Sequence, residues 1–130
     1  MFGDNVLFGH KEVAQDQKNR IVIPIETGRE PEEELVLLYN HTLGVHEIYS
    51  KKTIEEKQEQ LLYKALNAKE KKERIEIEKE LYEFWKSILR IEKLNKQGRM
   101  HLGNIFDSQD KILTIGANDH LIIESTNKEK

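Results

Sequence analysis

The chain has 130 residues, which is the length of one ordinary domain, with 35% charged and 37% hydrophobic residues. No apolar run approaches the roughly 20 residues that span a bilayer, and the N-terminus lacks a signal-peptide pattern, so membrane and secreted classes are not expected. The sequence has no cysteine, which excludes disulfides, thiol nucleophiles and thiolate metal sites. The net charge of -3 does not favour a strongly basic nucleic-acid-binding protein.

Charge and composition divide the chain into three segments. Residues 1–50 carry a net charge of -5, residues 51–90 carry +2, and residues 91–130 carry 0. The middle segment has no glycine or proline and is rich in good helix formers, so we expect it to be helical. The flanking segments contain short Ile-, Val- and Leu-rich runs separated by Gly, Pro and Asn, a pattern typical of strands. The expected order is therefore strands, helices, strands.

The expected strands are short. In the first segment, the apolar runs predict strands at residues 6–8, 21–25, 35–39 and 45–49. In the last segment they predict strands at residues 100–102, 112–115 and 121–123, while the run 88–91 is either a further strand or the end of the helical segment.

The helical segment is expected to begin at Thr53, because Thr53 and Glu56 fit a capping box in which each side chain bonds the other residue's amide. Its apolar face lapses at Asn67 and in the Lys-Glu run 69–74, so both one long helix and two helices are compatible with the sequence. A second apolar set recurs at helical spacing, and we expect it to be buried against the sheet or a neighbouring subunit. This set is Ile77, Leu81, Phe84, Trp85 and Ile88.

The two strand-rich segments resemble each other. Residues 16–24 (DQKNRIVIP) align without a gap with residues 95–103 (NKQGRMHLG). Such a duplication predicts two half-domains with one plan. Neither half has enough apolar residues for its own core, so we expect them to pair, either side by side or by interleaved hairpins. Two further pairs of segments align, residues 36–40 with 112–116 and residues 46–50 with 121–125.

Each copy is expected to form a tight turn followed by an arginine and a strand. A carboxylate or amide side chain opens the turn by accepting local backbone hydrogen bonds, and a later residue tolerates positive φ. Pairing of the halves would place both turns near a pseudo-two-fold axis. The turn-structuring residues are Asp16 and Asn19 in the first copy, and Asn95 and Gly98 in the second.

The D-x-K-x-R-I-x-I-P pattern of residues 16–24 resembles the swapped-hairpin domain of the SpoVT/AbrB superfamily. Its duplication around a helical insert resembles the MraZ family of bacterial transcriptional regulators, over nearly the whole chain. This resemblance implies an α+β fold in which duplicated half-domains form a small pseudo-two-fold β-barrel with a helical insert between the repeats. The implied single domain has a first β repeat at about 5–50, an insert at about 51–90, a second repeat at about 91–125 and a tail at 126–130.

The resemblance also implies a cytoplasmic, nucleoid-associated protein that forms a homo-oligomeric ring. Such a protein reads short direct repeats in promoter DNA of the division and cell-wall gene cluster. The family's D-x-x-x-R element maps onto Asp16 and Arg20, and in the second copy onto Asn95 and Arg99. Its basic position is Lys18 in the first copy.

The chain departs from the family pattern at several positions. Gln97 replaces the basic residue in the second copy, Asn95 replaces the acid, and Gly103 replaces the proline. Glu124 and Ser125 stand near the C-terminus, where the family commonly has a tryptophan. The acidic run 30–34 is a poor neighbour for phosphate.

Four basic residues are the candidate DNA contacts. Arginine offers a planar fork to phosphate or guanine, lysine adds a point charge, and a two-stranded β element can enter a major groove. One turn makes few contacts, so an oligomer would supply avidity. In the structural alternative, Asp16 and Arg20 form a salt bridge that closes the turn, while Arg99 bonds Asn95 or backbone carbonyls. The candidates are Lys18, Arg20, Lys96 and Arg99.

Enzymatic and metal-binding functions are not expected. The five histidines have no metal-ligand spacing, no carboxylate pair can be singled out, and the phosphate-loop and nucleophile-elbow motifs are absent from the sequence. We therefore expect no metal, cofactor or small-molecule substrate. The expected partners are double-stranded DNA and other copies of the chain. The alternative function is that of a non-enzymatic oligomeric interaction protein that keeps the fold and has lost DNA readout.

Overall fold

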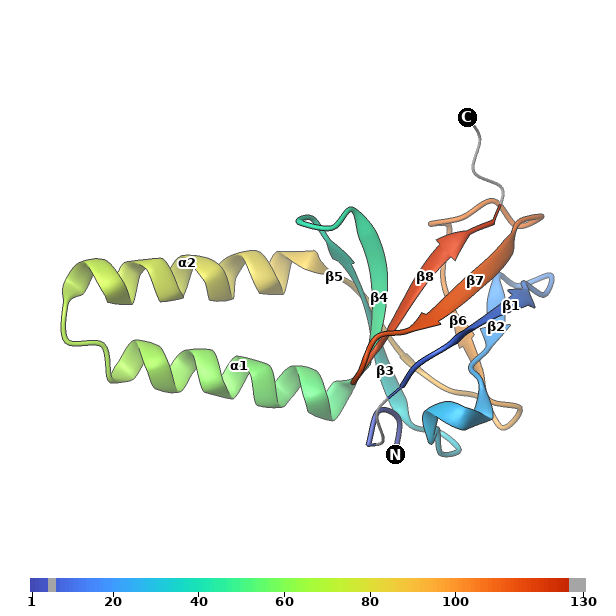
Figure 1. Ribbon diagram of the computed structural model, residues 1–130, viewed down its shortest axis with the longest axis horizontal. Helices are drawn as coiled ribbons and strands as arrows, with labels where there is room; N and C mark the ends of the chain where they lie inside the picture. The colour runs from blue at the N-terminus through green and yellow to red at the C-terminus, as the bar shows by residue number, and fades with distance from the viewer. Residues whose placement is uncertain (5–6, 127–130) are drawn as a thin grey trace.

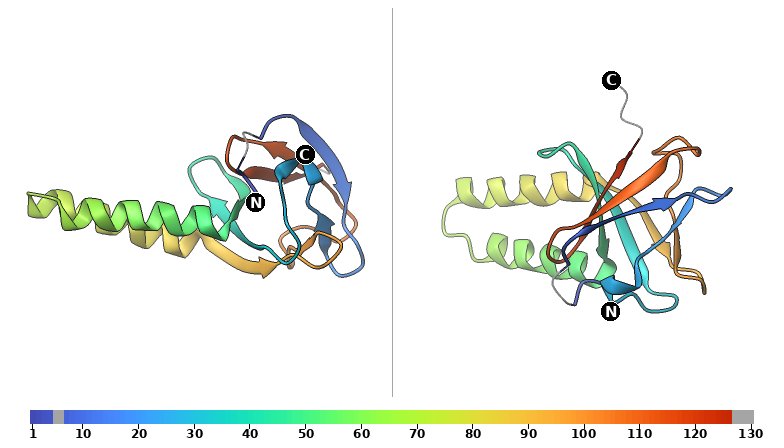
Figure 2. Two further views of the ribbon diagram at one scale, coloured as in Figure 1. Left: turned by 90° about the horizontal axis from the view of Figure 1, so that it is seen from below. Right: turned by 45° about the vertical axis from the view of Figure 1, so that its right-hand side comes forward.

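The computed structural model describes residues 1–4 and 7–126. Within them the chain forms an antiparallel β domain from which a pair of helices projects (Figures 1 and 2). In chain order the elements are β1 (His10–Ala14), β2 (Arg20–Val22), the 3-10 helix η1 (Ile25–Thr27), β3 (Glu34–Asn40), β4 (Val45–Ser50), α1 (Lys51–Leu66), α2 (Lys71–Ser87), β5 (Ile88–Lys93), β6 (Arg99–His101), β7 (Lys111–Gly116) and β8 (Leu121–Ser125).

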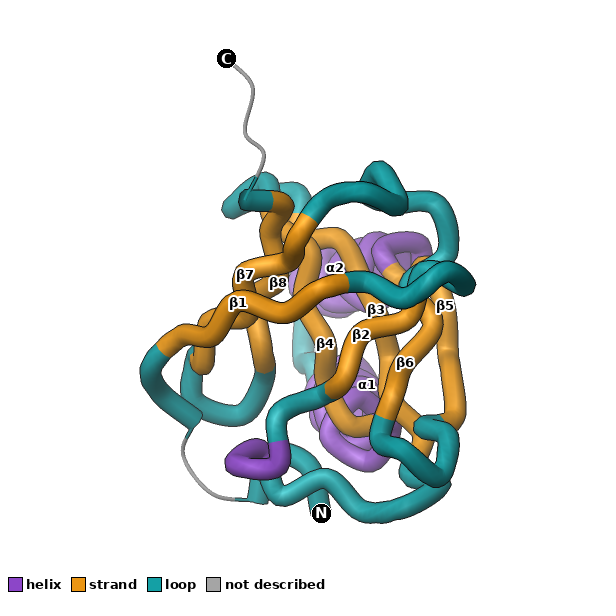
Figure 3. Tube along the Cα trace, turned by 90° about the vertical axis from the view of Figure 1, so that its right-hand side faces the viewer, coloured by secondary structure: helices purple, strands orange, loops and turns teal. Residues whose placement is uncertain are grey.

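The α+β fold that the sequence predicted is confirmed at this level. Six strands form one sheet in the order β1-β7-β8-β4-β3-β5, and β2 and β6 form a separate antiparallel ladder. Along the described strands no closed barrel is detected, because β1 and β5 are the edges of the six-stranded sheet. The β2–β6 ladder lies between these two edges when the molecule is viewed from the end away from the helices (Figure 3).

Strand pairing shows that the two repeats interleave. The first strand of each repeat pairs with the third strand of the other, as β1 with β7 and β5 with β3. The β2–β6 and β4–β8 ladders each join equivalent strands of the two repeats. Each half therefore supplies hydrogen-bond partners that the other half lacks, and of the two arrangements compatible with the sequence, interleaving is the one adopted.

The main core lies between the six-stranded sheet and the β2–β6 ladder. Ile21 and Met100 are opposite each other in the ladder, and both are fully buried. They pack with Leu35, Ile48 and Ile112 of the sheet in one apolar cluster. Burying each of these side chains stabilises the fold by about 1.5 to 3 kcal/mol. The ladder is therefore held to the sheet by its inward side chains, and its alternate residues face outward.

Three strand predictions need correction. The strand at residues 6–8 is wrong within the described part, since Leu7 forms only an isolated bridge with Asn118, Phe8 is 87% exposed, and residues 5–6 lie outside the description. The edge strand β1 was missed, because its sequence HKEVA is mostly polar and exposed. The strand expected at 21–25 ends at Val22, because Pro24 caps the 3-10 helix that follows and has no N–H for a ladder.

The register of β3 differs by one residue from the sequence alignment. Val13 of β1 pairs with Ile112, and Glu92 of β5 pairs with Leu35. Val13 and Glu92 occupy equivalent positions in the two repeats, so their pairing partners Ile112 and Leu35 are equivalent as well. The sequence alignment had instead matched Ile112 with Val36. A slip of one residue reverses the face of every side chain. The alignment of 46–50 with 121–125 agrees with the β4–β8 register.

The helical segment consists of two helices, and its start lies earlier than predicted. The Ser50 hydroxyl accepts a hydrogen bond from the Thr53 N–H at 3.0 Å, so Ser50 rather than Thr53 is the N-cap and α1 begins at Lys51. The chain leaves helical geometry at residues 67–70, where the apolar face lapses. The second helix ends at Ser87, and the ambiguous run from Ile88 is the strand β5.

The α2 apolar stripe is not buried against the sheet along its length, so of the two predicted partners the sheet covers only the end of the stripe. Trp85 is 55% exposed, and the other members of the stripe are only partly buried. The reason is that the helices project away from the sheet, so that only their base packs on it (Figure 1). There Phe84 and Ile88 contact a small cluster that includes Val36, Leu38 and Tyr49. Neither helix among the described residues has the length and apolar character needed to cross a bilayer.

Candidate nucleic-acid interface

The outward face of the β2–β6 ladder carries the two predicted arginines. Arg20 pairs with His101 and Val22 pairs with Arg99, while the intervening Ile21 and Met100 point into the core. The ladder lies at the end of the molecule opposite the helical hairpin (Figures 1 and 3). Arginines 79 positions apart in the sequence are thereby brought onto one short two-stranded element.

The first turn is closed by Asp16. Its Oδ1 accepts hydrogen bonds from the Lys18 N–H at 2.9 Å and the Arg20 N–H at 3.0 Å, and the Asn19 N–H donates to the Asp16 carbonyl. Asn19 adopts φ of 58°, in the left-handed region that asparagine tolerates better than most residues. The role that the sequence assigned to Asp16 and Asn19 in structuring this turn is consistent with this geometry.

The second turn repeats the first bond for bond. Asn95 Oδ1 accepts hydrogen bonds from the Gln97 N–H and the Arg99 N–H, both at 2.9 Å. The Gly98 N–H donates to the Asn95 carbonyl, and Gly98 has φ of 76°. An amide oxygen therefore replaces a carboxylate oxygen in this backbone role, which explains how Asn95 can stand where the resemblance leads one to expect an acid.

Each turn is also tied to the opposite strand. The Ile23 N–H donates to the Gly98 carbonyl, and the Leu102 N–H donates to the Asn19 carbonyl, each at 2.9 Å. These equivalent bonds extend the ladder beyond its three paired residues on each side. The turns are consequently fixed relative to each other and to the core, which limits the orientations open to their side chains.

Both arginines converge on a single carboxylate oxygen. Asp16 Oδ2 accepts from Arg20 Nε at 2.8 Å and from Arg99 Nη1 at 3.0 Å. Burial acts to raise the pKa of Asp16, but the backbone N–H groups of Arg20 and Lys18 and the two guanidinium groups outweigh it, so its pKa lies well below the usual range of an aspartate. Asp16 is thus an anion between two cations.

This arrangement realises part of the structural alternative. The Asp16–Arg20 salt bridge within the first turn is present, with both side chains about a quarter exposed. Arg99 bonds Asn95 through its backbone N–H, as that alternative foresaw, but its side chain crosses to Asp16 of the other repeat. Sequence spacing could not show this crossing, because it depends on the pairing of the two repeats.

The two candidate lysines differ from the arginines in their surroundings. Lys18 and Lys96 are exposed at the two turns, and neither ammonium group has an ion-pair partner within residues 1–4 and 7–126. With two arginines and one aspartate, this part of the surface carries a net charge of +3 although the whole chain carries -3. The structure thus brings all four candidate contacts to two linked turns.

The acidic run 30–34 is engaged elsewhere. Glu30 pairs with the N-terminal ammonium group at 2.9 Å, and Glu33 accepts from the Phe2 N–H at 3.0 Å. Glu34 lies 3.4 Å from the Lys51 ammonium group, and Glu32 lies 4.0 Å from that of Lys93. These glutamates have their contacts with cations or amides outside the β2–β6 ladder, so they do not cover the two arginines.

A further arginine at the second turn was missed by the sequence reasoning. Arg29 is partly buried, and its guanidinium group lies on the backbone of Gly98, where a Cβ atom would overlap it. The Nε atoms of Arg29 and Arg99 are both buried and have no hydrogen-bond partner among the described residues. Arg29 lies outside the repeated motif, so the alignment of the two copies gave no signal for it.

A second polar cluster lies near the base of the helices. Glu47 is only 3% exposed, and its carboxylate faces His120 Nε2 at 3.3 Å, Asn40 Nδ2 at 3.2 Å and the Tyr49 hydroxyl at 3.3 Å. Burial lowers the pKa of His120, but the carboxylates of Glu47 and Asp119 outweigh it and raise that pKa above its ordinary value. The polar groups of this cluster are one another's hydrogen-bond partners, and they connect β4 to the start of β8.

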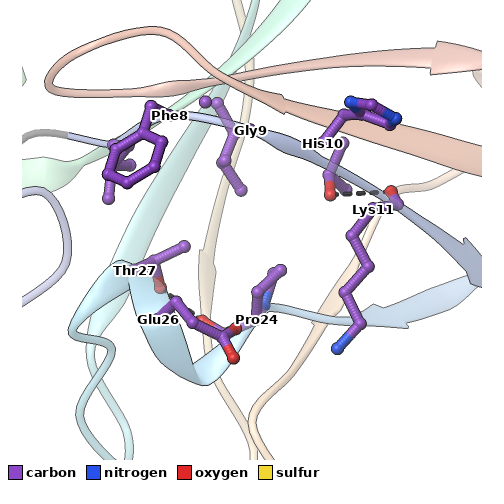
Figure 4. A pocket seen from close by; sticks show the side chains of 11 residues that line it. Phe8, Gly9, His10, Lys11, Pro24, Glu26 and Thr27 are labelled. Atoms are coloured by element: carbon purple, nitrogen blue, oxygen red, sulfur yellow. Dashed lines mark hydrogen bonds between the residues drawn. The ribbon is translucent and has the colours of Figure 1, made fainter.

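A hollow of about 350 Å³ separates β1 from η1 (Figure 4). Phe8, His10 and Lys11 line one side, and Glu26 and Thr27 line the other. In the second repeat the positions equivalent to Glu26 and Thr27 hold apolar residues that pack against the core, namely Ile105 and Phe106.

The described part of the chain contains no group of three or more His, Asp or Glu side chains arranged to hold a metal ion. Comparison of the chain with models of known protein families finds no match, and neither does comparison with curated proteins.

Proposed function

We propose that the protein is a sequence-specific DNA-binding transcriptional regulator and that the β2–β6 ladder is its DNA-contacting element. The observation that carries this proposal is the convergence of Arg20 and Arg99 on one oxygen of Asp16, at 2.8 and 3.0 Å, beside two exposed lysines. A guanidinium group held by a partly exposed carboxylate keeps N–H donors for a phosphate or for a guanine edge.

The two-stranded form of the ladder is one that can enter a groove of duplex DNA. The major groove is about 12 Å wide and admits a two-stranded β element. Lys18 and Lys96 stand on the turns at the two ends of this element, where backbone phosphates would pass, while Arg20 and Arg99 lie on its outward face. Lysines in such places position the protein, and arginines on the face read bases or add phosphate contacts.

For the fold, we propose duplicated SpoVT/AbrB-type half-domains of the MraZ kind, in which the β2–β6 ladder covers the open side of the six-stranded sheet as a pseudo-two-fold barrel. The interleaved pairing and the repeated turn hydrogen bonds support this proposal. On the same resemblance, we propose a non-enzymatic regulator that needs no cofactor, acts in the cytoplasm at the nucleoid, and recognises direct repeats in promoters of division and cell-wall genes.

Self-association into a ring is part of the proposal. One pair of turns offers few contacts, so several pairs on one DNA are needed for avidity. Large apolar side chains on the projecting helices support contacts between copies, because an unpartnered hairpin that exposes them favours association. A monomeric mass in solution at micromolar concentration would contradict this part. The most exposed of these side chains are Tyr63, Leu66, Tyr82 and Trp85.

The test is a DNA titration with a matched control. Duplexes are selected by the protein from a random-sequence pool, and binding is measured at several salt concentrations for wild type, for Arg20→Ala with Arg99→Ala, and for Lys72→Ala with Arg74→Ala on exposed α2. We expect the first variant to lose most of its affinity and sequence preference, and its plot of log K against log salt to flatten by about two units. Equal binding by all three proteins would refute the proposed contact role.

The alternative function, that of an oligomeric interaction protein without DNA readout, is favoured by the neutralising contact of Asp16 with both arginines. On that account the arginines only close the ladder. The same titration separates the two functions, because the alternative requires wild-type protein to select no sequence from the pool while it still forms oligomers.

A further inference from the structure

We infer that Arg29 and Arg99 together make the second turn the stronger of two unequal anion sites, and that Arg29 is a phosphate-contacting residue of the DNA interface. The inference rests on the proposed function for its biological ligand. It concerns a residue that lies outside both copies of the repeated motif.

The first ground is charge. The first turn combines Lys18 and Arg20 with the carboxylate of Asp16, which accepts four hydrogen bonds and sits between two guanidinium groups. The second turn has the neutral Asn95 in the equivalent place. Because Asp16 Oδ2 contacts both Arg20 and Arg99, its negative charge is shared, and before Arg29 is counted the basic residues give each turn the same charge of +2. With Arg29, the second turn reaches +3.

The second ground is the way Arg29 is seated. Gly98 is buried although it belongs to a surface turn, and the space that a Cβ atom would occupy there is filled by the Arg29 guanidinium group. The equivalent position in the first turn is Asn19, which also has positive φ. Asparagine and glycine both tolerate this positive φ. The lack of a side chain at Gly98 is therefore what leaves space for the Arg29 guanidinium group.

The third ground is unused hydrogen-bonding capacity. The Nε–H groups of Arg29 and Arg99 are buried atoms without a partner in the described structure, and Arg29 forms no ion pair there. A buried N–H without an acceptor is unfavourable, and more so on a cation. Both arginines are partly exposed, so an oxyanion with several acceptor oxygens would satisfy such donors by short, charge-assisted bonds once the guanidinium groups turn toward it. Phosphodiester groups of DNA have this chemistry.

The experiment compares Arg29→Gln with Arg74→Gln on the exposed face of α2, which removes the same charge. Duplex affinity is measured against salt for both variants and for Arg29→Lys. We expect Arg29→Gln to weaken binding about tenfold and to reduce the salt slope by about 0.9, one phosphate contact, while Arg74→Gln leaves both unchanged. Arg29→Lys should keep the slope. If Arg29→Gln binds the duplex with the affinity and the salt slope of the wild type, the inference is overturned and the proposed function stays intact.

A second measurement works without DNA. The ¹⁵N-labelled wild-type protein is titrated with inorganic pyrophosphate while the arginine Nε–H resonances are followed by NMR. Larger shifts for Arg29 and Arg99 than for Arg20 support the unequal anion sites. If the protein shows these shifts and binds no duplex in the DNA titration, the DNA function is refuted and the anion sites stand. Equal shifts, or none, refute the inference whatever the DNA result.

Gly98→Asn probes the seat of Arg29. Asparagine tolerates the left-handed backbone, so this change mainly displaces the guanidinium group. We expect it to reproduce the affinity loss of Arg29→Gln, with Gly9→Asn as the control that leaves affinity near wild type, because Gly9 also has a positive φ and a Cβ atom there would meet nothing within 4 Å. If Gly98→Asn binds DNA as tightly as wild type, Arg29 does not act from this position.

Discussion

Replacing Asp16 by asparagine separates its two structural roles. Asn95 shows that an amide oxygen keeps both backbone hydrogen bonds of such a turn. The substitution should therefore preserve the turn and remove only the ion pairs that Asp16 Oδ2 forms with Arg20 and Arg99.

The expected loss of stability follows from the exposure of the partners. Asp16 is 20% exposed, Arg20 27% and Arg99 33%, so water screens both pairs in part. Partly exposed pairs of this kind contribute up to about 1 kcal/mol each. We expect Asp16→Asn to lower the free energy of unfolding by about 1 to 2 kcal/mol at neutral pH, which corresponds to a fall in Tm of about 3 to 6 °C for a chain of this length.

The loss should depend on pH in one direction. Because the folded protein lowers the pKa of Asp16 below its ordinary value of 3.8, the carboxylate contributes its full stabilisation above that value. The contribution disappears as the pH falls through the lowered pKa. The difference between wild type and Asp16→Asn should therefore be constant from neutral pH down to about 4 and shrink below it.

The assay is urea unfolding from pH 7 to pH 3, with Asp107→Asn as the matched control. Asp107 Oδ1 accepts the Gln109 N–H in the same kind of turn, and Asp107 has no ion pair among the described residues. If Asp16→Asn is as stable as Asp107→Asn at pH 7, the carboxylate does not hold the two repeats together through the arginines, and the reasoning is refuted.

Two further predictions concern the helix base and its neighbours. Glu47→Gln should cost about 1 to 3 kcal/mol, because it removes the buried charge that faces the partly buried His120. Since the folded protein raises the pKa of His120, the wild type should lose stability as the pH rises above about 6.5 and through that raised pKa, and unfolding curves of Glu47→Gln should show a smaller decline, because Asp119 still faces His120. Ser50→Ala should cost about 1 kcal/mol by removing the α1 cap, with faster amide exchange at Thr53; exchange as slow as in wild type would place the cap elsewhere.

The parts of the fold that sequence predicted best were those with strong local signals. Residues 16–24 and 95–103 contain the turn-forming Asx residues and the residues suited to positive φ, and these form the same local hydrogen bonds in both copies. The polar edge strand β1 gave no such signal, because its pairing with β7 depends on a strand about a hundred residues away. The α2 stripe shows a different limit, since helical spacing shows which face is apolar but not whether the sheet or a neighbouring subunit covers it, and the sheet covers only its end.

The sequence by itself determined the duplication, the helical insert and the four basic candidates, because these follow from residue types at short spacing. Only the tertiary structure decided that the repeats interleave, that Arg99 crosses to Asp16 of the other repeat, and that Arg29 lies on Gly98. The two arginine contacts join residues 83 and 69 positions apart, and their energy depends on the register of strands that no local pattern specifies. The charge of +3 that the four candidate contacts and Asp16 give to the linked turns, and the further charge of Arg29, arise in the same way, from folding rather than from composition.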